Sequence, residues 1–155
     1  MLQNLDVFLR LLAGLACGGV IGLNRDLHHK PAGFRTFGLV GLGSALAVLV
    51  IVQTGGSTVP DTEATSRVIQ GVLTGIGFLG AGVILHRVSE GRVAGLTTAA
   101  AVWLTAGLGV AAGAGQFTMV WWGLALAMAA LLIGGRIERL VERVLGRTEG
   151  EELPP

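Results

Sequence analysis

Residues 96–135 read LTTAAAVWLTAGLGVAAGAGQFTMVWWGLALAMAALLIGG and contain no Asp, Glu, Lys or Arg. A helix of about 20 residues crosses a bilayer core of roughly 30 Å, because each residue adds about 1.5 Å. This stretch is long enough for two crossings, and the glycines at Gly113 and Gly115 permit a tight turn between them. The sequence therefore predicts transmembrane helices at 96–114 and 117–135.

Three further charge-free stretches predict three more crossings. They lie between Arg10 and Arg25, from Thr36 to Pro60, and between Arg67 and Arg87. Charged residues make up 14% of the 155 residues and hydrophobic residues 52%, whereas an ordinary soluble domain has roughly 25% charged residues. We expect an all-α integral membrane domain over residues 1–135, with its first three spans at 5–24, 36–53 and 68–85.

The distribution of charge predicts the orientation. Basic residues follow the first, third and fifth spans, whereas the connection after the second span holds Asp61 and Glu63 with one Arg67. By the positive-inside rule the N-terminus lies outside and the C-terminus in the cytoplasm. A net charge of +1 gives no reason to expect a nucleic-acid partner. The basic residues are Arg25, Lys30 and Arg35, then Arg87 and Arg92, then Arg136, Arg139, Arg143 and Arg147.

Residues 136–147 continue the chain as a predicted helix of a different kind. Ile137, Leu140 and Val144 recur at helical spacing among the arginines. This pattern predicts an amphipathic basic helix on the cytoplasmic leaflet, and binding of a partner protein is the alternative. Residues 148–155 are polar and acidic and end in two prolines, so we expect a disordered tail.

Two parts of the sequence resemble each other. Gly18-Gly19-Val20-Ile21 precedes Arg25, and Ala81-Gly82-Val83-Ile84 precedes Arg87. The pattern Ala-Gly-x-x-Thr then opens both the second span, at 32–36, and the fourth, at 94–98. We interpret this as a duplicated helical hairpin followed by a separate fifth helix, with chance likeness of small-residue helices as the alternative. Duplication would place the charged turns together on the cytoplasmic side.

Glycines recur at helical spacing in the first and third spans. Residues four apart lie on one helix face, and small residues there let two helices approach closely in lipid. We predict that these glycines pack helices within the chain, and a homodimer interface is the alternative. The glycines concerned are Gly14, Gly18 and Gly22 in the first span and Gly71, Gly75, Gly77, Gly80 and Gly82 in the third.

The turn after the first span, residues 24–30, is the richest polar segment. His28 and His29 supply too few ligands for a transition-metal site and are expected to be solvated. Mg²⁺ prefers oxygen ligands, so Asn24 and Asp26 are the candidate metal ligands, although no metal site is established by them. Arg35 is either a membrane anchor beside Thr36 or the ion-pair partner of Asp26.

Two polar pairs lie within the predicted spans. Asp6 and Arg10 share a face of the first helix and are expected to pair or anchor near the outer boundary, with an outer cation entrance as the alternative. Gln70 shares a face with Thr74 in the third span and is expected to donate hydrogen bonds to another helix.

Four motifs together resemble the MgtC/SapB family of bacterial inner-membrane proteins. They are Ile21-Gly22-Leu23-Asn24-Arg25, Ala32-Gly33-Phe34-Arg35-Thr36, the run Gly75-Ile76-Gly77-Phe78-Leu79-Gly80-Ala81-Gly82-Val83-Ile84, and Gly95-Leu96-Thr97-Thr98-Ala99-Ala100 with Trp103. The candidate functional residues at and near the charged turns are Arg25, Arg35, Thr36, Gln70, Arg87, Thr97 and Thr98. The family usually has Glu at the position of Asn24, which weakens a metal site there.

The resemblance implies a multi-pass protein of the bacterial inner membrane that is linked to magnesium homeostasis. The first function that it suggests is Mg²⁺ transport. The alternative is a regulator that does not transport and instead binds a membrane ATPase such as the ATP synthase. Family members commonly carry a soluble C-terminal domain, and we expect this chain to be a short form without it. No catalytic motif is present, so we expect no enzyme, and Mg²⁺ is the one candidate cofactor.

Overall fold

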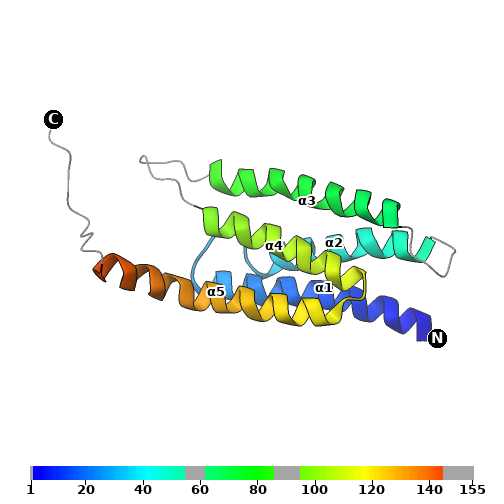
Figure 1. Cartoon of the computed structure of the whole chain (residues 1–155), viewed down its shortest axis with the longest axis horizontal. Helices are drawn as coiled ribbons and strands as arrows, with labels where there is room; N and C mark the ends of the chain where they lie inside the picture. The colour runs from blue at the N-terminus through cyan, green and yellow to red at the C-terminus, as the bar shows by residue number, and fades with distance from the viewer. Residues whose placement is uncertain (1, 55–61, 86–94, 145–155) are drawn as a thin grey trace.

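The computed structural model describes residues 2–54, 62–85 and 95–144, and these residues form five helices (Figure 1). The helices are α1 Leu2–Leu27, α2 Phe34–Thr54, α3 Thr62–Leu85, α4 Leu96–Gly113 and α5 Phe117–Val144. All five are long and apolar enough to cross a membrane, so the predicted all-helical membrane fold with five spans is confirmed. Loop residues 87 and 92 and the tail at 148–155 lie outside the described residues.

Successive helices run in opposite directions along one bundle (Figure 1). The start of α1 and the end of α5 consequently lie at opposite ends of the bundle, as an odd number of crossings requires. The turn between α4 and α5 is closed by Gly115, which has φ of 76°. The next amide, of Gln116, donates to the carbonyl of Ala111 over 2.8 Å, which is the usual way to satisfy a helix C-terminus. Which end faces the cytoplasm stays a prediction from the basic residues.

The fifth helix extends beyond the predicted fifth span. The sequence predicted a span that ends at Gly135 and an amphipathic basic helix at 136–147, and α5 runs through both glycines to Val144. Glycine within a helix costs about 1 kcal/mol relative to alanine, which is too little to interrupt a helix supported on both sides. The basic segment up to Val144 is therefore an extension of the spanning helix.

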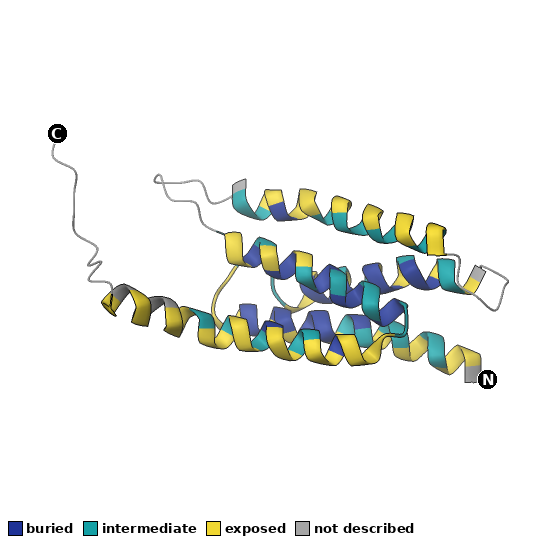
Figure 2. Cartoon of the chain, in the orientation of Figure 1, coloured by how far each residue is buried: buried dark blue, intermediate teal, exposed yellow. Residues whose placement is uncertain are grey.

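The core is built from α1, α2 and α4. Figure 2 shows the buried positions concentrated on these three helices, whereas α3 and α5 are mostly exposed. Ile21 of α1, Phe37 of α2 and Ala106 of α4 are completely buried. Since the surrounding solvent of a spanning helix is lipid, the exposed apolar faces of α3 and α5 are suited to the bilayer or to other membrane helices.

Glycines allow the three core helices to meet backbone to backbone. A Cβ atom added at Gly14 would lie 2.7 Å from the carbonyl oxygen of Gly41 on α2, and one at Gly22 would lie 2.7 Å from that of Gly33. A Cβ at Gly18 would overlap the carbonyl oxygen of Phe37. The glycine stripe of α1 thus lies in the α1–α2 interface.

The glycines of α3 are in different surroundings. A Cβ atom added at Gly71, Gly75, Gly77 or Gly82 would meet no other atom within 4 Å, and one at Gly80 would make ordinary contact with the Cβ of Ala99 at 3.6 Å. The expectation that the third-span glycines pack helices within the chain is therefore wrong for these four. α3 contacts α4 and α2, but not through these four positions.

This difference predicts opposite effects for two matched substitutions. Gly18→Ala should destabilise the bundle by about 1–3 kcal/mol, because α1 and α2 must separate to admit the methyl group. Gly75→Ala should be neutral or slightly stabilising, because alanine is the better helix former and meets open space. Unfolding of the purified variants in mixed detergent, followed by circular dichroism, measures both effects. Equal stability of the two variants would contradict the assigned packing.

Candidate functional site

The turn between α1 and α2 is held by Asp26. Its carboxylate accepts the backbone N–H of Phe34, the first residue of α2, over 2.8 Å. Gly33 allows this approach, because a Cβ there would overlap the Asp26 carboxylate. The hypothesis that Asp26 pairs with Arg35 is wrong. The carboxylate instead accepts the amide at the start of α2, and a side-chain oxygen is a suitable acceptor for an N–H group that has no partner within its own helix.

His28 and His29 belong to the same turn. The ring Nδ1 of His28 lies 2.7 Å from the carbonyl oxygen of Asn24, and the amide of His29 donates to the carbonyl oxygen of Asp26 over 3.0 Å. Within the described part of the chain, no group of three or more His, Cys, Asp or Glu side chains could hold a metal ion. The candidate ligands Asn24 and Asp26 therefore do not belong to a larger cluster of metal-binding side chains among the described residues.

Arg25 lies at the centre of this end of the bundle. Only 6% of the residue is exposed, and its Nη2 donates to the hydroxyl of Thr98 on α4 over 2.5 Å. Its Nε is also buried and has no hydrogen-bond partner among the described residues. Thr98, which is 1% exposed, thus receives a charged donor from a residue 73 positions earlier in the chain.

A second arginine of α1 fixes the opposite end of α4. Arg10 pairs with Asp6 at 2.9 Å and donates to the carbonyl oxygen of Gly113 over 3.2 Å. That carbonyl belongs to the last turn of α4, where the helix dipole favours a cation. The expected Asp6–Arg10 pairing is present. In addition, the hydrogen bond from Arg10 to Gly113 holds α1 against α4.

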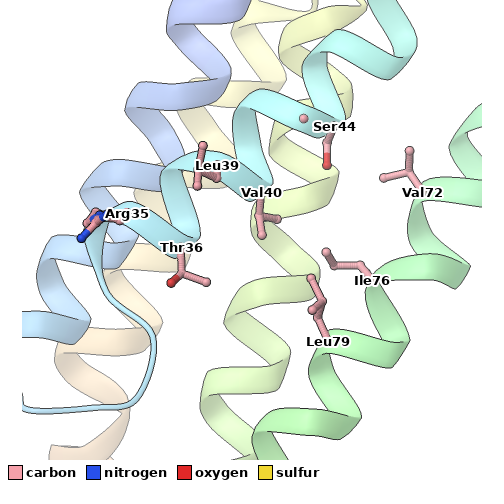
Figure 3. A pocket seen from close by; sticks show the side chains of 9 residues that line it. Arg35, Thr36, Leu39, Val40, Ser44, Val72, Ile76 and Leu79 are labelled. Carbon is pink, nitrogen blue, oxygen red and sulfur yellow. The ribbon is translucent and has the colours of Figure 1, made fainter.

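The other candidate residues are scattered. Gln70 is exposed and donates to Ser66 over 3.3 Å within α3, so the expectation of a hydrogen bond to another helix is wrong. Thr97 is exposed at the start of α4, beside Thr98. Arg35 and Thr36 line one end of a cleft of about 700 Å³ between α2 and α3, together with Ser44, Val72 and Leu79 (Figure 3). Arg87 lies outside the described residues.

The structure brings together Arg25, Thr97 and Thr98 of the predicted set, which line one cavity, and leaves Arg35, Thr36 and Gln70 apart from them. The sequence named Arg25 and Thr98 but did not predict their contact. The available signal was the repeat, which places the turn after the first span and the turn before the fourth on one side of the membrane. It carries no information on which side chains meet.

Comparison with known sequences gives the family. The model of the MgtC family matches residues 11–140. The chain belongs to the MgtC family. It is 42% identical over 97% of its length to Protein SrpB of Synechococcus elongatus, of which it covers 90%. No solved structure matches the chain significantly.

One of two longer relatives is connected to magnesium by its name. The chain is 38% identical over 78% of its length to YhiD of Escherichia coli K12, whose name describes it as a candidate magnesium transporter. It is 44% identical over 70% of its length to Protein MgtC of Salmonella typhimurium. It spans 56% of the first and 44% of the second, about half of each. Of these two names, that of YhiD speaks of transport.

The contact between Arg25 and Thr98 leads to a matched pair of variants. Thr98→Val keeps the shape of the side chain but leaves the buried guanidinium without its acceptor, so the bundle should lose about 1–3 kcal/mol of stability. Thr98→Ser keeps the hydroxyl and should lose much less. Detergent unfolding of both variants measures the difference. If Thr98→Val unfolds like the wild type, the hydrogen bond does not support the fold.

Proposed function

We propose that this MgtC-family protein acts in magnesium homeostasis in the bacterial inner membrane by binding a membrane ATPase, such as the ATP synthase, and that it does not itself move Mg²⁺. The observation that carries this proposal is the buried guanidinium of Arg25. It lies between Asn24 and Asp26, the two candidate magnesium ligands, in the sequence. A fixed positive charge in partly desolvated surroundings repels a divalent cation strongly.

The oxygen atoms of this turn also support the proposal. Mg²⁺ requires near-octahedral oxygen coordination and usually binds through one or two carboxylates. The one carboxylate of the turn, that of Asp26, already accepts the amide of Phe34, and the carbonyl oxygen of Asn24 lies against His28. A cation would have to compete with both contacts and with Arg25.

The proposed contact with the ATPase is the open side of α3. A Cβ added at Gly71, Gly75 or Gly82 of this helix would meet no other helix among the described residues. The cleft of about 700 Å³ toward α2 is lined mainly by apolar side chains, among them Val72 and Leu79 (Figure 3). In lipid, helices associate by close packing on small residues. A spanning helix of the ATPase could approach α3 as closely as α2 approaches α1.

Mg²⁺ transport is the second candidate function, and it is favoured by the name of the Escherichia coli relative. It requires a path for the ion along the bundle. The duplicated hairpins predicted from the sequence would suit such a path, because transporters are often built from internal repeats. A homodimer through α3 is compatible with either function. The copurification experiment described below also detects it.

Reconstitution into liposomes that contain a Mg²⁺-sensitive dye separates the two functions. We expect Mg²⁺ entry no faster than in liposomes without protein, and we expect the tagged protein to copurify with a membrane ATPase. Mg²⁺ entry that is abolished by Asp26→Ala in a folded protein would establish transport and overturn the proposal.

A matched pair of variants tests the assigned surface. Gly75→Leu should lower recovery of the ATPase at least several-fold, because the larger side chain keeps a partner helix away from α3. Gly107→Leu on α4 is the control, since a Cβ there also meets open space within the chain. Equal recovery of the ATPase with both variants would show that the contact does not lie on α3. Loss of a homodimer alone with Gly75→Leu would assign this surface to a second copy of the chain.

A further inference from the structure

A polar cavity of about 280 Å³ lies where α1, α4 and α5 meet at one end of the bundle. Its wall includes Arg25 of α1, Lys30 of the following turn, Gly95 and Thr97 at the start of α4, and Gly134 of α5. Both charged residues in this wall are basic, and the described lining contains no acidic residue. The cavity is therefore electropositive.

Hydrogen-bond donors are available to a bound anion there. Arg25 is more than nine-tenths buried, and its buried Nε has no hydrogen-bond partner among residues 2–54, 62–85 and 95–144. Gly95 precedes α4 with φ of 96° and offers no side-chain cap, so the first N–H groups of this 18-residue helix lack the usual acceptor. A helix N-terminus and a guanidinium whose buried Nε lacks a partner, at one cavity, together favour an oxyanion, and phosphate above all.

A second, apolar cavity adjoins the first. It has a volume of about 190 Å³ and shares Thr97, Ala130 and Leu131 with the polar cavity. Its other lining residues, including Ile21, Leu104 and Ala127, lie one to two helical turns further from the end of the bundle. The two cavities thus join a basic chamber at the membrane boundary to an apolar chamber deeper in the membrane.

We propose that these cavities bind one anionic phospholipid, with its phosphate beside Arg25 and Lys30 and an acyl chain between α4 and α5. Free phosphate would use the same basic chamber but would leave the apolar chamber empty. The apolar chamber, the small residues Ala127 and Ala130, and the weak contact of α5 with α1 all favour the lipid. Basic pockets between spanning helices are known to suit such headgroups. The site is independent of whether the protein transports Mg²⁺ or binds an ATPase.

Native mass spectrometry of the purified full chain tests this site. The protein is mixed in mild detergent with phosphatidylglycerol and phosphatidylcholine of identical acyl chains, or with inorganic phosphate. We expect one phosphatidylglycerol per chain to be retained at least tenfold better than phosphatidylcholine. Equal retention of the two lipids, or retention of inorganic phosphate that excludes phosphatidylglycerol, would overturn the proposal.

Two matched pairs of variants locate the lipid. Lys30→Gln should lower phosphatidylglycerol retention about tenfold, whereas Arg35→Gln, which removes an equal charge from the cleft between α2 and α3, should not. Ala130→Trp should block the acyl chain, whereas Ala129→Trp, at the preceding position, which lines neither cavity, should not. Circular dichroism confirms folding, and Lys30→Gln keeps the test decisive if Ala130→Trp misfolds. Equal losses within either pair would show nonspecific association and refute the site.

Discussion

The close approach of α1 and α4 to the backbone of α2 is the constraint on which the structure depends. Gly14 of α1 and Gly109 of α4 both press against the carbonyl group of Gly41, where any side chain would overlap the oxygen or come within 2.7 Å of it. In lipid, burial of apolar surface between helices gains little, so such contact must hold the bundle together. Three helices fixed at one carbonyl group have little freedom to rotate or slide, and this sets the register of every other contact.

The two arginines of α1 follow from that register. Arg10 and Arg25 are 15 residues apart, as are their partners Thr98 and Gly113 on α4. At about 1.5 Å per residue the two contacts are roughly 22 Å apart, so each lies toward one boundary of the membrane. A charged group is least costly there, because its apolar stem packs in the bundle while the guanidinium stays near the polar region.

The outer helices α3 and α5 are held more loosely, and the cavities lie along them. The cleft beside α3 is largely apolar and opens beside glycines at which an added Cβ would meet no other helix among the described residues, and this is the surface that we propose for a protein helix. The cavities beside α5 combine a basic chamber with an apolar one, and these are the cavities that we propose for a lipid. In both proposals the rigid core of α1, α2 and α4 stays unchanged and the contacts are made along the outer helices.

The sequence by itself determined the five membrane helices and the turn at Gly115, because the length of charge-free segments and the conformational freedom of glycine are local properties. It did not distinguish the glycine stripe of α1 from that of α3, since spacing shows which residues share a face and not whether a neighbour covers that face. It likewise suggested Arg35 as a partner of Asp26, whereas the Asp26 carboxylate accepts the amide of Phe34 at the start of α2. The contact of Arg25 with Thr98 spans 73 positions. Only the tertiary structure decided it, because such a contact depends on how α1 and α4 rotate and align when both pack against α2.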